Sequence, residues 1–90
     1  MTDRELLELA AKAAGIFDLR FDNNCVAYRN VHIEWNPLTD DGDAFRLAVK
    51  CLPFHTLQYS REDYDHCQQD PYAATRRAIV RAASEIGKNL

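Results

Sequence analysis

The sequence predicts an α+β domain with three helices and a mainly antiparallel sheet of four to five short strands, in the order α-βββ-α-β(β)-α. Three segments carry apolar residues at helical spacing, and each begins with a residue that caps helices. Between the first two of these segments, residues 16–35 alternate between apolar and polar side chains. Two-residue polar turns interrupt this alternation, which is typical of antiparallel strands.

The first helix is expected over residues 3–14. Thr2 and Glu5 have the spacing of a capping box, and Leu6 lies where it can pack on the residue before the cap. Gly15 occupies the position at which helices often end with a left-handed residue.

A three-stranded meander is expected over residues 16–35. Residues 17–22 alternate strictly, Asn23 and Asn24 suit a tight turn, and residues 25–28 and 31–35 form two further strands. The polar positions predict that one face of this sheet is wet or only lightly covered.

The second helix follows Trp35 through a turn rich in acidic residues. Pro37 favours an extended residue before it, Asp40 is placed to cap the helix, and Pro53 ends it. The positions at helical spacing on its expected buried face are Phe45, Ala48, Val49 and Leu52. We expect this face to pack against Trp35 or the sheet.

A strand is expected over residues 54–59, a polar turn over 60–63 and a second, weaker strand over 64–68. The third helix then begins at Asp70, with Pro71 in its first turn and Gly87 at its end. Its predicted buried side is Tyr72, Thr75, Ala78, Ile79, Ala82, Ala83 and Ile86, and its predicted outer side is Arg76, Arg77, Val80, Arg81, Ser84, Glu85 and Lys88.

Composition limits the class of protein. Ninety residues suit one domain over 1–90, and 47% hydrophobic with 28% charged residues is typical of a globular protein. No apolar run is long enough to span a bilayer, and the first residues lack signal-peptide features, so we expect a cytoplasmic protein. The three cysteines are then expected to be reduced.

Metal, cofactor and catalytic sites are not expected. Asp40, Asp41 and Asp43 lack the ligand spacing of a calcium loop and suit helix capping better. The possible zinc ligands, which contain no close CxxC or HxxxH pair, are Cys25, His32, Cys51, His55, His66 and Cys67. No glycine-rich phosphate loop or nucleophile elbow is present, and Cys51 lies near an apolar helix face where an inert thiol is expected.

Two surfaces are candidates for interaction. The first is the basic side of the last helix, formed by Arg76, Arg77, Arg81 and Lys88, which suits phosphate or, more simply, solvent and protein contact in a chain of net charge −3. The second is an aromatic surface formed by Phe54, Tyr59 and Tyr64, for which a small core has little room. We expect the second surface to form a homodimer.

Three segments resemble one family, the phage ABA sandwich domain. They read RELLELAAKAAGI (4–16), WNPLTDDGDAFRLAVK (35–50) and DPYAATRRAIVRAA (70–83), and together cover about half the chain. The resemblance implies a small uncharacterised bacteriophage or prophage protein with an α/β/α sandwich, in which helices lie partly across each face of a short sheet. It implies no known reaction and no catalytic residue.

The predicted function is therefore that of a non-enzymatic phage or prophage accessory protein that contacts a phage or host protein. One alternative is a nucleic-acid-associated module that uses the basic side of the last helix. A second alternative is a small-ligand binder or enzyme with its site between the second helix and the sheet.

Overall fold

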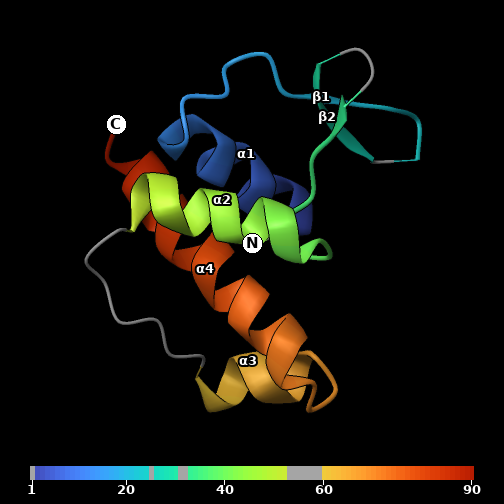
Figure 1. Cartoon of the computed structure of the whole chain (residues 1–90), viewed down its shortest axis with the longest axis vertical. Coiled ribbons are helices and arrows are strands. Elements are labelled where there is room, and N and C mark those ends of the chain that lie inside the picture. The colour runs from blue at the N-terminus through green and yellow to red at the C-terminus, as the bar shows by residue number, and fades with distance from the viewer. Residues whose placement is uncertain (1, 25, 31–32, 53–59) are drawn as a thin grey trace.

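The computed structural model describes residues 2–24, 26–30, 33–52 and 60–90. Its elements are α1 (Asp3–Ala13), β1 (Arg20–Phe21), β2 (Ala27–Asn30), β3 (Ile33–Glu34), α2 (Asp41–Cys51), α3 (Arg61–His66) and α4 (Pro71–Lys88), shown in Figure 1. These four helices and one antiparallel sheet confirm an α+β fold. Within the described ranges, no helix is both long and apolar enough to cross a membrane.

The three predicted helix starts are confirmed by their hydrogen bonds. The Glu5 amide donates to the Thr2 hydroxyl over 3.2 Å, and the Thr2 amide donates back to the Glu5 carboxylate over 3.3 Å. Asp40 accepts from the Asp43 amide over 2.7 Å, and Asp70 accepts from the first turn of α4. Each cap satisfies amides that a helix cannot pair internally.

The sheet has the predicted meander topology, with order β1-β2-β3 and antiparallel pairing throughout. Arg20 pairs with Tyr28 and Tyr28 with Glu34, so these three side chains share one face. Phe21 pairs with Ala27 on the other face, where Ala27 is buried and Phe21 packs against the core. On the first face Arg20 and Glu34 are exposed and Tyr28 is half-buried, so this face is polar and only lightly covered, as the alternation predicts.

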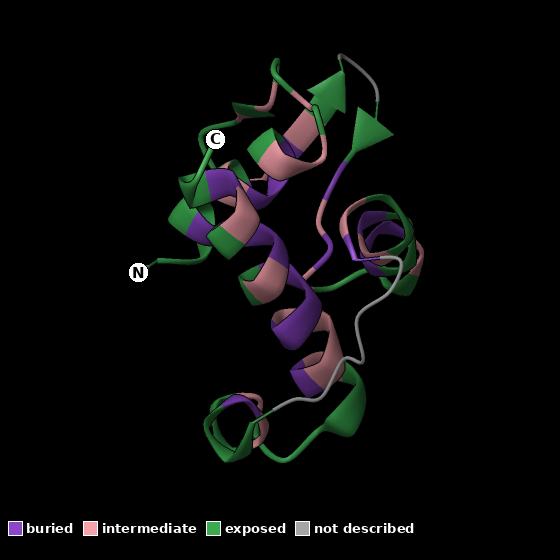
Figure 2. Ribbon diagram, turned by 90° about the vertical axis from the view of Figure 1, so that its left-hand side faces the viewer, coloured by how far each residue is buried: buried purple, intermediate pink, exposed green. Residues whose placement is uncertain are grey.

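Helix α4 is the centre of the fold, because it packs on each of the other three helices. In Figure 2 its buried residues recur along a helix that runs through the middle of the molecule. Val80 and Ala83 are completely buried, and the backbone of α1 passes so close to Gly87 that a Cβ there would collide with the Leu9 carbonyl oxygen. Small residues on α4 thus permit a close approach of α1.

The prediction of a strand at residues 64–68 is wrong, because α3 occupies Arg61–His66. Ser60 and Asp63 form a capping box at its start, with the Asp63 amide donating to the Ser60 hydroxyl over 3.1 Å. Gln68 and Gln69 then adopt left-handed backbone conformations that let the chain turn into α4. The predicted strand at 54–59 lies outside the described residues, and the α/β/α layer order remains a prediction.

The predicted buried face of α2 is also wrong in part. Leu52 is buried, but the Phe45 and Val49 side chains are 69% and 57% exposed. The buried positions are instead Asp43, Ala44 and Leu47, on a face rotated away from Phe45 and Val49. Burial alone would favour Phe45 inside, so other contacts set the rotation of this helix.

Two details of the last helix differ from the sequence prediction. Val80 and Ser84, predicted on its outer side, are buried, and Tyr72, predicted on its buried side, is exposed. The helix also continues through Gly87 to Lys88. The buried side is broader than predicted because α1, α2 and α3 all pack on α4.

Candidate interaction surface

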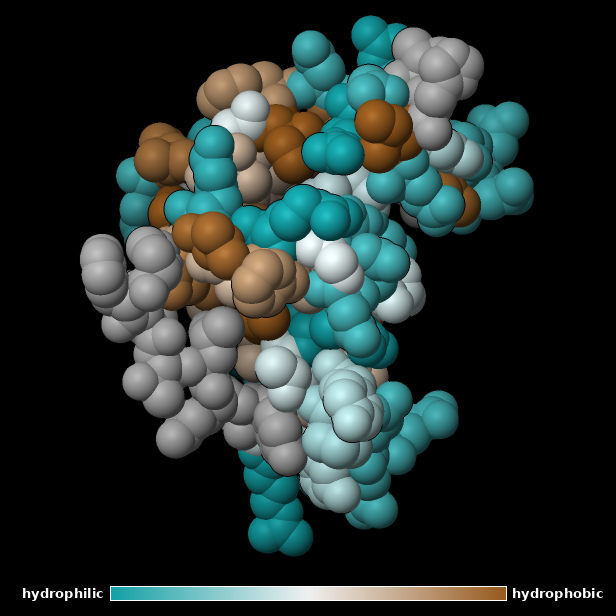
Figure 3. Space-filling model, in the orientation of Figure 1, coloured by the Kyte–Doolittle hydropathy of each residue, from teal (hydrophilic) through white to brown (hydrophobic). Residues whose placement is uncertain are grey.

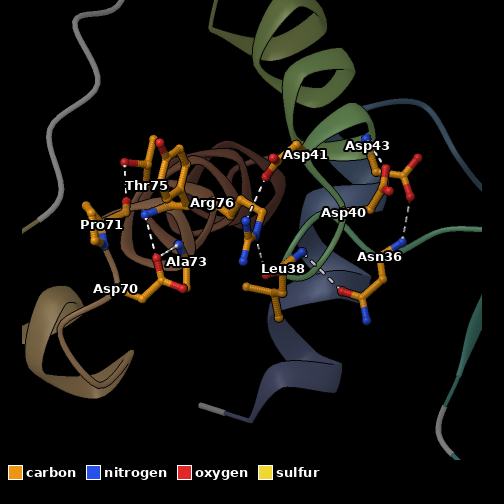
Figure 4. A network of polar contacts seen from close by, with 11 residues as sticks. Asn36, Leu38, Asp40, Asp41, Asp43, Asp70, Pro71, Ala73, Thr75 and Arg76 are labelled. Atoms are coloured by element: carbon orange, nitrogen blue, oxygen red, sulfur yellow. Dashed lines mark hydrogen bonds and ion pairs between the residues drawn. The ribbon is translucent and has the colours of Figure 1, made fainter.

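The start of α2 is held by a network of carboxylates and amides, shown in Figure 4. The buried Asp43 carboxylate accepts a hydrogen bond from the backbone amide of Asn36 over 3.0 Å and another from the Arg46 guanidinium over 2.7 Å. The Leu38 amide donates to the Asn36 side chain over 3.1 Å. These contacts tie the turn before α2 to its first two turns, and they place Asp43 rather than Phe45 toward the interior.

Arg76 joins α4 to this network. The Arg76 Nε donates to the Leu38 carbonyl over 2.9 Å, and the Arg76 Nη1 pairs with the Asp41 carboxylate over 2.7 Å (Figure 4). The Arg76 side chain is only 17% exposed. Its two contacts connect α4 to the turn and to α2, so the guanidinium has a structural role.

Arg77 and Arg81 bind two further elements. Arg77 pairs with Asp3 of α1 over 3.1 Å, and its side chain is 14% exposed. Arg81 pairs with Asp63 of α3 over 2.6 Å, and the Asp63 side chain is 5% exposed. Burial raises the pKa of Asp63, but the hydrogen bonds from Arg81 and from the amide and hydroxyl of Ser60 outweigh it, so the pKa lies below its ordinary value.

All four cations that the sequence singles out on α4 therefore have carboxylate partners, since Lys88 pairs with Glu85 on its own helix over 3.1 Å. The partners Asp3, Asp41 and Asp63 lie on three other elements, and no local sequence signal links them to α4. The interaction role of these cations stays a prediction, and their charge is already matched within the fold.

The outward side of α2 carries an apolar surface that sequence reasoning assigned to the core. Gly42, Phe45, Arg46 and Val49 lie on it, and we call this set the α2 outer face. Figure 3 shows hydrophobic atoms over the middle and C-terminal part of α2, on the side toward the viewer. Phe45 and Val49 are one helical turn apart, so their exposed side chains adjoin.

The second predicted surface is only partly described. Tyr64 lies in α3 and is half-buried, whereas Phe54 and Tyr59 lie outside the described residues. The prediction that these three residues form a dimer contact remains open.

A hollow of about 340 Å³ lies between α2 and the sheet, where the sequence placed a possible ligand site. Ile33 lines one side, and Asp40, Asp43 and Arg46 line the other. Both carboxylates already pair with the Arg46 guanidinium, over 3.9 Å and 2.7 Å. On this side of the hollow, the two carboxylates and the guanidinium are thus engaged with each other.

The possible metal ligands and thiols show no assembled site in the part of the chain that the structure describes. No three His, Cys, Asp or Glu side chains there are grouped to hold a metal ion, while Cys25, His32 and His55 lie outside it. Cys51 is half-buried, and burial raises the pKa of its thiol, which the nearby Lys50 offsets only in part. A thiol with a raised pKa is a weak nucleophile at neutral pH.

Comparison of the chain with protein families, with curated proteins and with solved structures found no match.

Proposed function

We propose that this chain is a non-enzymatic protein that acts through protein–protein contact at the α2 outer face. The observation that carries the proposal is the exposure of Phe45 and Val49, side by side on a helix whose opposite face lies in the core. Adjacent exposed apolar side chains on a small domain often mark a surface that another protein covers. Among the described residues, the other large exposed apolar side chains belong to other segments: Phe17, Ile33, Tyr72 and Leu90.

The charge distribution favours a protein partner over a nucleic acid. A nucleic-acid module needs cations that are available to phosphates, and binding strength rises with the number of phosphates that they neutralise. Three arginines of α4 instead hold α1, α2 and α3 in place, and the chain has a net charge of −3. Their use against phosphate would compete with the contacts that hold the helices together.

The biological setting that we propose rests on the resemblance of residues 4–16, 35–50 and 70–83 to the phage ABA sandwich domain. In that setting the chain is a bacteriophage or prophage accessory protein in the cytoplasm of a bacterial host. Its partner is a phage or host protein, and its helices and sheet form α/β/α layers.

Affinity capture with matched variants tests the contact surface. The wild-type chain, Phe45→Glu and Tyr72→Glu are immobilised and exposed to host lysate, with and without nuclease. Both substitutions add one negative charge at an exposed aromatic residue on a helix. We expect proteins retained by the wild type and by Tyr72→Glu to be lost with Phe45→Glu. Equal retention by all three would refute the α2 outer face, and nuclease-sensitive, salt-sensitive retention would favour the nucleic-acid alternative.

A further inference from the structure

We infer that α3 is a detachable segment: the ion pair between Asp63 and Arg81 holds it on α4, and loss of that pair releases α3 while α1, α2 and α4 stay packed. Release of a single element is expected where that element buries few apolar side chains and is held by few contacts with the rest of the fold. Helix α3 has both properties, and the turn that follows it is strained.

Helix α3 differs from the other helices in what it buries. Within Arg61–His66 the one buried side chain is Asp63, a carboxylate, and the Tyr64 ring is half-buried. Helix α1, by contrast, buries Leu6 and Leu7 together with two alanines. Burial of apolar surface is the main favourable term in packing, and α3 gains little of it. Figure 1 shows α3 at the lower end of the molecule, beside α4, which is the described element on which it mainly packs.

The Asp63 carboxylate joins α3 to α4. Its Oδ1 accepts from the Arg81 Nη1 over 2.6 Å, and its Oδ2 accepts from the amide and hydroxyl of Ser60 at the start of α3. A buried carboxylate that loses its cation is strongly unfavourable, because the remaining charge is not compensated. Without Arg81, Asp63 is therefore more stable in water than against α4, and α3 leaves with it.

The turn between α3 and α4 opposes the docked position. Gln68 and Gln69 have φ angles of 57° and 63°, a left-handed conformation that is uncommon and costly for residues other than glycine. Release of α3 lets both residues return to ordinary conformations. A helix of six residues is not stable alone, so α3 unwinds once it has left α4, and release and unwinding are one event.

Release of α3 changes the surface of α4. The partly exposed Arg81 side chain loses its carboxylate partner and becomes available to another anion. A hollow of about 430 Å³ also opens, because Ser60 and Asp63 line it together with Leu6 of α1 and residues of α4. The position of α3 thus controls whether this part of α4 is covered.

Hydrogen exchange of single amides, followed by NMR in increasing urea, tests the inference. The amides of Tyr64, Cys67 and Gln69 depend on α3, since they donate to carbonyl oxygens of residues 60–64. The amides of Val80 and Ala83 lie in the completely buried part of α4. In the wild type we expect the α3 amides to be at least about a hundredfold less protected than these core amides. Their exchange should also depend less on urea, because local release exposes little surface.

Two matched substitutions in α4 identify the contact that holds α3. Arg81→Gln breaks the pair without changing the sequence or the cap of α3. We expect it to lower the protection of the α3 amides by about tenfold to a hundredfold, while the core amides remain far better protected than those of α3. Arg76→Gln is the same substitution on the same helix, but it breaks the pair with Asp41 of α2. It should leave the protection of the α3 amides unchanged.

Four results would overturn the inference. Equal protection and equal urea dependence of the α3 and core amides in the wild type would show that they unfold as one unit. Unchanged α3 protection in Arg81→Gln would show that the ion pair does not hold α3. Loss of core protection together with α3 protection in Arg81→Gln would show that the pair holds the whole fold. A similar loss of α3 protection in Arg76→Gln would show a general effect of removing a cation from α4.

Discussion

Replacing Gly87 by Ala tests how closely α1 and α4 pack. In an isolated helix this change is favourable, because alanine has the better helix propensity by up to about 1 kcal/mol. In the folded chain the new Cβ would collide with the Leu9 carbonyl oxygen and lie 2.8 Å from the Leu9 carbonyl carbon. These atoms belong to the backbone of α1, so no side-chain rotation can relieve the contact, and α1 must shift away from α4.

The expected result is a net loss of stability. Overpacking of a core commonly costs about 1–3 kcal/mol and sometimes more, and a rigid backbone neighbour favours the upper part of this range. After subtraction of the helix-propensity gain, we expect the free energy of unfolding to fall by about 2 kcal/mol. For a domain of this size that corresponds to a decrease in Tm of about 8–16 °C. Urea and thermal unfolding followed by circular dichroism measure both quantities.

Gly42→Ala is the matched control. A Cβ at Gly42 would lie 3.1 Å from an Asp40 carboxylate oxygen and 3.3 Å from the Arg46 guanidinium, and both groups belong to flexible side chains. We expect this variant to be as stable as the wild type or more stable by up to about 1 kcal/mol. If Gly87→Ala were equally stable, the close approach of α1 to α4 would be refuted.

Three further predictions concern single side chains. Phe45→Ala should lower the free energy of unfolding by less than about 1 kcal/mol, because the ring is mostly exposed, and a loss near 3 kcal/mol in urea titration would place it in the core. Asp70→Ala should cost about 0.5–2 kcal/mol in the same assay, since the Tyr72 and Ala73 amides lose their acceptor, and an unchanged stability would contradict the cap. Asp63→Asn should lower the free energy of unfolding by about 1–3 kcal/mol, because it breaks the charged pair with Arg81 of α4. The pKa of Asp63 is lower in the folded chain than in the unfolded chain, where it is about 3.9. The ionised Asp63 therefore stabilises the fold fully above the unfolded-state pKa, and this stabilisation disappears as pH falls through the folded-state pKa. Acidification should therefore lower the Tm of the wild type more than that of Asp63→Asn, and parallel decreases would contradict this linkage.

The features that sequence predicted well depend on residues close together in the chain. The caps at Thr2, Asp40 and Asp70 each join groups no more than three residues apart. The left-handed backbone of Gly15 and the antiparallel meander likewise follow from local turns and alternation. For such elements the backbone hydrogen bonds and the signals that predict them lie in the same short segment.

Helix α3 begins with a local capping signal, but its stability also depends on a residue far away in the sequence. Ser60 and Asp63 have capping-box spacing in the sequence, yet six residues are too few for a helix to be stable alone. The pair between Asp63 and Arg81, eighteen positions apart, anchors α3 on α4. The α4 arginines could thus be named from the sequence as one group, but their separate partners could not.

The rotation of α2 was decided by tertiary contacts, and with it the candidate surface. The sequence offers two overlapping apolar faces, one with Phe45 and Val49 and the other with Ala44 and Leu47. Helical periodicity cannot choose between them, because both recur at the same spacing. The backbone amide of Asn36, bound to Asp43, and the Arg76 guanidinium, bound to Asp41, hold the helix. In this orientation Ala44 and Leu47 lie in the core. Phe45 and Val49 are left outside in the orientation in which Asp43 and Asp41 reach these partners.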